Sequence, residues 1–288
     1  MLEYLINPFL EFEFMRRSLL GCLLLSMGAA PVGVFLMLRK MSLTGDAMAH
    51  AILPGAATGF LFAGLSVSAM TIGGLVAGCL IALLSGISAR KTSTPEDSSL
   101  AAFYLTSLAL GVMIISLKGS NVDLLHFLFG STLALDNAAL TLLTCVSLIT
   151  LTSFTLLYRA LVLECVDPEF LRSVSKVSPV AHYAFLVLVV LNLVAGFQAL
   201  GTLMSVGLMI LPGAIARFWV RQLEGMIILA CVLAFSACVI GLLASYYLRL
   251  PTSPTIILSL GCVYLFSIVF GRDKGLLTQK ISFKYNYR

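Results

Sequence analysis

The chain has few charged residues: Asp, Glu, Lys and Arg fill 11% of its 288 positions. Soluble domains carry about a quarter, so no separate soluble domain is expected. Hydrophobic residues fill 60% of the sequence, and they form runs of about 20, the length that a helix needs to cross a bilayer. Because lipid offers the backbone no hydrogen-bond partners, these runs must be helical. The composition predicts an all-α, polytopic transmembrane bundle.

Several motifs of other chemistry are missing. The sequence has no G-x-x-x-x-G-K-[ST] loop, so the chain is not expected to bind ATP in that way. It has no H-E-x-x-H and no nucleophile–base pair at a useful spacing, which argues against an intramembrane enzyme. Its seven cysteines include no C-x-x-C pair, which argues against structural zinc or a redox centre. We also expect no cleavable signal peptide, since the first 17 residues contain Glu3, Glu11 and Glu13 and no cleavage site follows.

Nine apolar segments are predicted to span the membrane as one permease domain over residues 1–288. They cover about 18–38, 43–64, 69–89, 99–117, 138–158, 180–198, 201–220, 225–248 and 252–271. The stretch 122–135 is apolar as well, but it is too short to cross the bilayer as a helix. We expect it to be re-entrant or interfacial.

The basic residues predict the orientation of these spans. Cytoplasmic loops carry an excess of Lys and Arg. With the N-terminus outside, 14 of the basic residues fall on the inner side and 4 on the outer side. The C-terminus, with the basic tail 272–288, is therefore expected in the cytoplasm. The net charge of +5 then reflects membrane orientation, and it is no sign of nucleic-acid binding.

The largest predicted inner loop covers residues 159–179. It mixes acidic and basic residues with proline. We expect one short amphipathic helix there, capped by Asp167 with Pro168 at its first position. A solvated connector is the alternative.

Asp46 and His50 are the residues most indicative of chemistry. Their i,i+4 spacing places them on one helix face, one turn apart. An ionised Asp at mid-bilayer costs about 2.5–3.5 kcal/mol on insertion scales, so that face should meet protein or a water-filled path. Imidazole and carboxylate together suit zinc, manganese and iron. The alternative is that Asp46 caps a helix and His50 bonds a carbonyl.

Two stretches combine small residues with proline, near Asp46 and around residues 201–213. Small residues let helices approach closely, and proline bends a helix by removing a hydrogen bond. The residues expected to serve packing and bending are Gly45, Pro54, Gly55, Gly201, Pro212 and Gly213. His126 is a weaker metal candidate near the predicted outer face, where a structural role is favoured. His182 begins a span beside the inner loop, and no ligand role is assigned to it.

These stretches resemble the ABC-3 class of permease subunits, importers of zinc, manganese and iron. The match consists of Met41-Ser42-Leu43-x-Gly45-Asp46-Ala47-x-x-His50-Ala51-x-Leu53-Pro54-Gly55, with Asp123-Leu124-x-His126-x-Leu128-Phe129-Gly130, Gly201-Thr202-Leu203 and Leu211-Pro212-Gly213-Ala214-x-Ala216. Length and span count also agree, so the resemblance covers nearly the whole chain.

The resemblance implies a homodimeric pore in the bacterial inner membrane. A separate cytoplasmic ATPase would dock on the inner loop and hydrolyse ATP, and an extracytoplasmic binding protein would deliver the metal. Asp46 and His50 match the positions expected to hold the ion in transit, with no permanently bound cofactor. The expected coupling residues are Asp167, Glu169, Phe170 and Arg172. Lys176, where a glycine is usual, and Pro168, an addition, depart from the family's pattern.

Two questions stay open on the sequence. An Asp and a His from each of two chains give four N/O ligands without a thiolate, which suits capture and release, and this set does not choose among zinc, manganese and iron. The alternative function is an ATP-independent carrier of a metal or metabolite, which inverted repeats would favour. The two halves show no convincing repeat. A membrane scaffold without transport would leave the pair unexplained.

Overall fold

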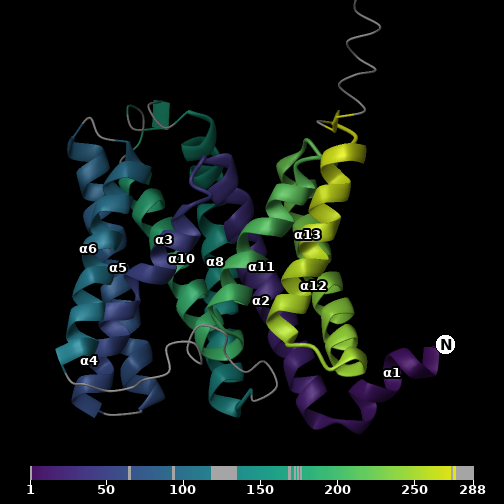
Figure 1. The fold of residues 1–288 in the computed structure, drawn as a ribbon. Helices are drawn as coiled ribbons and strands as arrows, with labels where there is room; N and C mark the ends of the chain where they lie inside the picture. The colour runs from purple at the N-terminus through teal and green to yellow at the C-terminus, as the bar shows by residue number, and fades with distance from the viewer. Residues whose placement is uncertain are drawn as a thin grey trace, which may run out of the picture.

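The computed structural model describes residues 2–63, 66–92, 95–117, 135–167, 170–171, 173, 175, 177–273 and 275–276. Within these ranges the regular structure is entirely helical, which confirms the predicted class (Figure 1). The helices are α1 (Leu2–Glu11), α2 (Glu13–Leu38), α3 (Thr44–Ala51), α4 (Leu53–Ala63), α5 (Val67–Lys91), α6 (Glu96–Leu117), α8 (Asn137–Val166), α10 (Val177–Leu200), α11 (Thr202–Ala216), α12 (Leu223–Leu248) and α13 (Thr252–Phe270).

Seven of the described helices are long and apolar enough to cross a membrane. Their windows have a mean hydropathy of 1.4 to 2.8, as burial in hydrocarbon requires. These windows lie in α2, α5, α6, α8, α10, α12 and α13. The chain is therefore a multi-pass membrane protein.

The other two predicted spans do not form continuous helices of spanning length. The segment 43–64 divides into α3 and α4 at Ile52, because Pro54 has no N–H to bond the carbonyl of His50 one turn earlier. The segment 201–220 contains α11, whose 15 residues extend about 22 Å against about 30 Å of hydrocarbon. Nine crossings therefore stay a prediction.

The loop predicted over 159–179 is shorter in the structure. Helix α8 continues to Val166, and α10 already begins at Val177. Residues 159–166 extend the helix because Leu161 and Glu164 find buried positions against the bundle. The connection between the two helices is thus confined to residues 167–176, and we call it the coupling segment.

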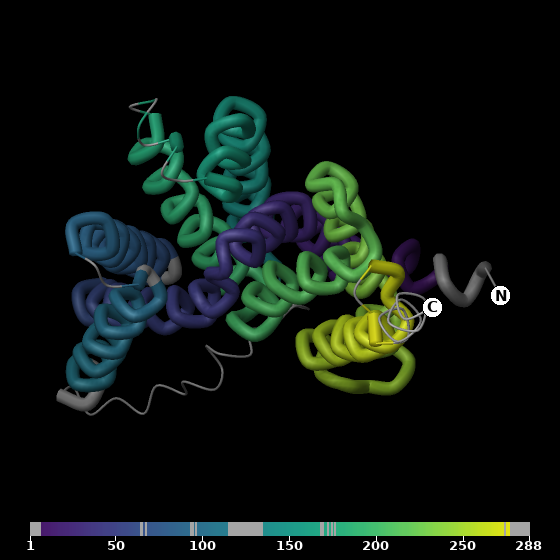
Figure 2. The backbone as a smooth tube through the Cα atoms, turned by 90° about the horizontal axis from the view of Figure 1, so that it is seen from above, coloured from purple at the N-terminus to yellow at the C-terminus, as the bar shows by residue number. Residues whose placement is uncertain are grey.

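Helix α2 forms the centre of the bundle and packs against α8, α10, α11 and α12. Seen from above, α4, α5 and α6 lie to one side of it and α13 lies to the other (Figure 2). Polar side chains join its neighbours in the core: the Asn192 amide donates to Thr150 Oγ1 at 2.8 Å, and the Ser147 hydroxyl donates to the Leu24 carbonyl at 2.8 Å. Such bonds satisfy polar groups that lipid cannot.

Close backbone contacts occur at the glycines near α11 and α4. A Cβ on Gly213 would lie 3.2 Å from the Val34 Cα in α2, and one on Gly45 would lie 2.7 Å from the Met209 Cε. A Cβ on Gly55 would overlap the backbone carbonyl of Gly73 in α5. Gly201, between α10 and α11, has a φ of 90°, a backbone conformation that residues other than glycine rarely adopt.

One end of the bundle collects basic residues. Helices α2, α5, α8, α11 and α13 end there, and α6, α10 and α12 begin there (Figure 1). The residues at these helix ends include Arg39, Lys40, Arg90, Lys91, Arg217, Arg221 and Arg272, and we call this the basic end. A basic end is typical of the cytoplasmic side, so the predicted orientation fits this arrangement and stays a prediction.

Candidate metal site and coupling segment

Helix α3 carries Asp46 in its first turn and His50 in its last turn. A tight turn leads into it from α2: Lys40 has a φ of 59°, and the Met41 N–H bonds the Leu36 carbonyl at 2.8 Å. The Thr44 N–H then bonds the Met41 carbonyl at 3.0 Å. The helix with the candidate ligands is therefore fixed directly to the end of α2.

The two faces of α3 differ in exposure. Ala47, Met48 and Ala51 are buried against the bundle, whereas Asp46 is exposed and His50 is half-buried in the single chain. The His50 ring lies 6.4 Å from the Tyr104 ring of α6, at an interplanar angle of 28°. An exposed carboxylate is costly in lipid, so the face that carries Asp46 should meet protein or a water-filled path.

Neither candidate ligand takes the structural role considered as an alternative. The first residue before α3 is Leu43, which makes no side-chain cap. Among the described residues, no hydrogen bond or ion pair joins Asp46 or His50 to another side chain or to the backbone. The same part of the chain holds no cluster of three or more His, Cys, Asp or Glu residues able to bind a metal. One chain thus offers only Asp46 and His50 as candidate ligands at this place, and we call these two residues the metal pair.

The coupling segment begins with the predicted cap. The Asp167 carboxylate accepts a hydrogen bond from the Phe170 N–H at 2.9 Å, which is the geometry of a helix N-cap. Phe170 is 52% exposed, whereas Leu171 is buried. The segment is therefore anchored to the bundle by the buried Leu171 side chain, and the Phe170 ring is exposed on its surface.

Some predicted residues lie outside the described ranges. They are Glu169 and Arg172 of the coupling segment, Pro168 and Lys176 beside them, His126 with most of the stretch 122–135, and most of the basic tail.

The comparison with protein families decides the family. The model of the ABC 3 transport family matches residues 11–271. This chain belongs to the ABC 3 transport family. It is therefore a permease subunit, the transport component of its system.

Relatives in the ABC 3 transport family align over almost the entire chain. The manganese import system permease protein ScaB of Streptococcus gordonii is 30% identical over 98% of this chain and 100% of its own length. The chelated iron transport system membrane protein YfeD of Yersinia pestis is 27% identical over 98% and 94%. A chain in the structure of PsaBC from Streptococcus pneumoniae in complex with Fab is 28% identical, with a TM-score of 0.82 over 97% and 100%.

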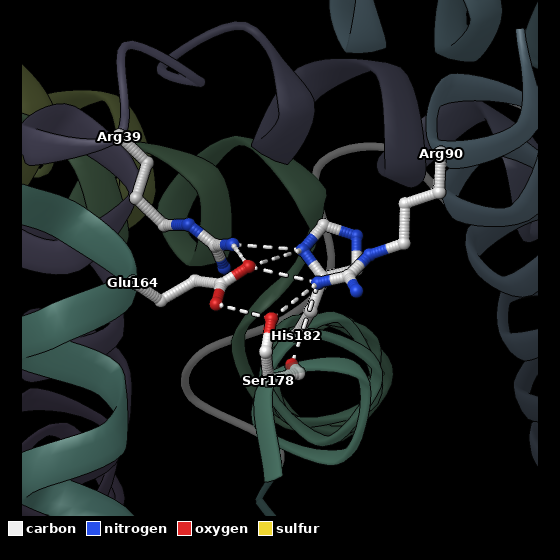
Figure 3. A network of polar contacts seen from close by, with 5 residues as sticks. All are labelled: Arg39, Arg90, Glu164, Ser178 and His182. Atoms are coloured by element: carbon white, nitrogen blue, oxygen red, sulfur yellow. Dashed lines mark hydrogen bonds and ion pairs between the residues drawn. The ribbon is translucent and has the colours of Figure 1, made fainter. Parts of the chain in front are cut away.

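A buried charged cluster at the basic end was missed by the sequence interpretation (Figure 3). Glu164, in the last turn of α8, accepts a hydrogen bond from Arg90 Nη2 at 2.8 Å and another from the Ser178 hydroxyl at 2.9 Å. Arg39 Nη2 lies 3.6 Å from the same carboxylate and 2.7 Å from His182 Nδ1. Because a guanidinium only donates, this contact requires Nδ1 of His182 to accept.

The cluster lies well inside the protein. The Glu164 and His182 side chains are 1% and 4% exposed, and those of Arg39 and Arg90 are 8% and 14% exposed. The only sequence signal was a glutamate among apolar residues in the predicted inner loop 159–179, on the side predicted to be cytoplasmic. The structure assigns His182 to this cluster, away from the metal pair on α3.

Proposed function

We propose that this chain is the membrane-spanning subunit of an ATP-driven importer of a divalent transition metal. Two copies form the path, and the ion passes between them. Manganese or iron is favoured by the names of the relatives, and the ligand chemistry also accommodates zinc. Each ion is cargo, and none is held permanently.

The observation that carries the proposal is the placement of Asp46 and His50. On α3, Asp46 is exposed and His50 is half-buried in the single chain, and neither side chain has a hydrogen-bond or ion-pair partner among the described residues, in a member of a transport family. A second copy related by a two-fold axis would bring a second pair to the same place and so supply four N/O ligands. It would also shield Asp46 from lipid, which removes the cost of exposing a carboxylate there.

The ligand set suits an ion in transit. Carboxylate and imidazole bind first-row divalent ions, and the absence of thiolate from the pair avoids the softest and most retentive ligand. Transport requires binding strong enough to admit the ion and weak enough to release it. An extracytoplasmic binding protein would bring the metal to this site, in the inner membrane of a bacterium.

We assign the energy source to the basic end of the bundle. A cytoplasmic ATPase would dock on the coupling segment, where Asp167 orders the backbone and Phe170 is exposed. Glu169 and Arg172 are proposed to contribute to the same surface. We assign the basic end to the cytoplasm on the distribution of Lys and Arg.

The test is uptake by proteoliposomes that contain the permease with its ATPase and are supplied with the extracytoplasmic binding protein, measured separately for Mn²⁺, Fe²⁺ and Zn²⁺. We expect uptake of at least one of these ions to require ATP on the side of the membrane where the ATPase is bound. Uptake that proceeds equally without ATP would contradict the proposal and favour a secondary carrier. Uptake of none of the three ions would contradict any role in metal import.

A further inference from the structure

The buried cluster links the two ends of the coupling segment. Glu164 precedes the segment by three residues, and Ser178 follows it by two. The Ser178 hydroxyl donates to Glu164 Oε2 at 2.9 Å, so the two ends of the segment are held together. A displacement of the segment that separates its two ends must therefore move the Glu164 carboxylate or break this bond.

Arg39 connects the same cluster to the metal pair. It is the C-cap residue directly after α2, and only residues 40–43 separate it from α3. These residues form the hydrogen-bonded turn described above, with the Met41 N–H on the Leu36 carbonyl and the Thr44 N–H on the Met41 carbonyl. A movement of Arg39 is therefore transmitted through a short, ordered connection to the helix that carries Asp46 and His50.

Arg39 is also the most loosely held member of the cluster. Two guanidinium groups share one carboxylate, and Arg90 lies closer to it than Arg39 does, at 2.8 Å against 3.6 Å. Arg39 contacts His182 through Nη2 and stacks over the Phe185 ring at 5.0 Å. Its Nη1 is buried and has no hydrogen-bond partner among the described residues. A buried donor without a partner lowers stability, so its presence needs a physical explanation.

We propose that Arg39 is a positioning residue that links the coupling segment to α3, so that movement at the ATPase-docking side reaches the metal pair. This inference rests on the proposed function. Arg39 touches neither the metal nor the ATPase and acts through Glu164 and the turn into α3.

Arg39→Met is the sharpest variant. It keeps a long apolar side chain against Phe185 and leaves the Arg90–Glu164 pair balanced in charge, so the fold should persist. Arg217→Met is the matched control, because Arg217 is exposed at the same end, just after α11, and its side chain makes no hydrogen bond or ion pair within the described residues. Arg39→Lys keeps the charge but not the planar fork, and should restore part of the function.

The experiment measures three quantities on the permease–ATPase complex in proteoliposomes: ATPase recovered with the permease, ATP hydrolysed and Mn²⁺ taken up. For Arg39→Met we expect normal ATPase recovery and hydrolysis, with Mn²⁺ uptake per ATP lowered about tenfold, within the range typical of coupling between two sites. Arg217→Met should match the unsubstituted protein, and Arg39→Lys should lie between.

Three results would overturn the inference. They are unchanged uptake per ATP in Arg39→Met, a proportional fall of hydrolysis and uptake, and loss of the ATPase from the complex. If Arg39→Met is not recovered from the membrane, Ser178→Ala takes its place, with the same expected direction and the same overturning results. Failure of the unsubstituted complex to take up Mn²⁺, Fe²⁺ or Zn²⁺ would instead overturn the proposed function and this inference with it.

Discussion

Asp46 on α3 and Glu164 on α8 are both carboxylates on apolar helices, but their surroundings are opposite. Asp46 is exposed on the single chain and makes no polar contact within the described ranges. Glu164 is 1% exposed and is bonded by Arg90 and Ser178, with Arg39 close by. One carboxylate is left open to something outside the chain, and the other is satisfied within it.

The difference teaches how to separate a ligand from a structural or positioning group in a membrane bundle. A buried carboxylate with several donors contributes to the free energy of unfolding, because its loss leaves cations without a counter-charge. An open carboxylate contributes little to that free energy, and because a carboxylate is costly in lipid, its presence on an exposed face of a membrane protein points to a function. Substitution of Glu164 should therefore change mainly the free energy of unfolding, and substitution of Asp46 should change mainly transport.

The largest effect on stability is expected for Glu164→Ala. The change leaves Arg39 and Arg90 buried without a carboxylate, and breaking a buried ion pair on one side costs about 3–5 kcal/mol. Equilibrium unfolding in mixed detergent micelles would measure it. Glu224→Ala, at an exposed acid in the first turn of α12, is the control and should change the free energy by less than about 0.5 kcal/mol. Equal effects of the two substitutions would contradict the claim that the buried carboxylate stabilises the fold more than an exposed one does.

Ser178→Ala sharpens the comparison within the cluster. It deletes the hydrogen bond to Glu164 and leaves the Arg90–Glu164 ion pair in place. We expect a loss of about 1 kcal/mol, typical of one net hydrogen bond, in the same unfolding measurement. A loss as large as that of Glu164→Ala would mean that the hydroxyl, and not the charge pairing, dominates the cluster.

Asp46→Asn should have the smallest effect on stability. The side chain is exposed and has no described partner, so the free energy of unfolding of the isolated chain should change by less than about 0.5 kcal/mol. A clear destabilisation would show that Asp46 has a structural contact, as in the alternative in which it caps a helix.

The sequence predicted what depends on local pattern. Seven spanning helices followed from apolar runs, because the thickness of hydrocarbon fixes the length of such runs. The Asp46–His50 pair followed from an i,i+4 spacing within one helix. The division of 43–64 at Ile52 was expected only as a bend at Pro54, since the residues alone do not tell whether a neighbouring helix supports a bend or a break.

The charged cluster depends on pairing between distant positions. Arg39 and His182 are 143 residues apart, and Arg90 and Glu164 are 74 apart. No helical or strand periodicity relates residues so far apart in the chain. In the sequence alone, Arg39 and Arg90 cannot be told from the other Lys and Arg residues of the basic end. Only the packing of α2, α5, α8 and α10 brings Arg39 and Arg90, and not Arg217, to the same carboxylate.

The central claim is that Asp46 and His50 hold the metal as it passes. It is tested most directly by ATP-dependent metal uptake with Asp46→Asn and His50→Ala, at equal permease abundance and equal ATPase recovery. Asp46→Asn removes the charge at nearly constant shape, and His50→Ala removes the nitrogen ligand. Uptake should fall to the level of liposomes without protein in both variants. Full uptake by both would contradict the ligand assignment.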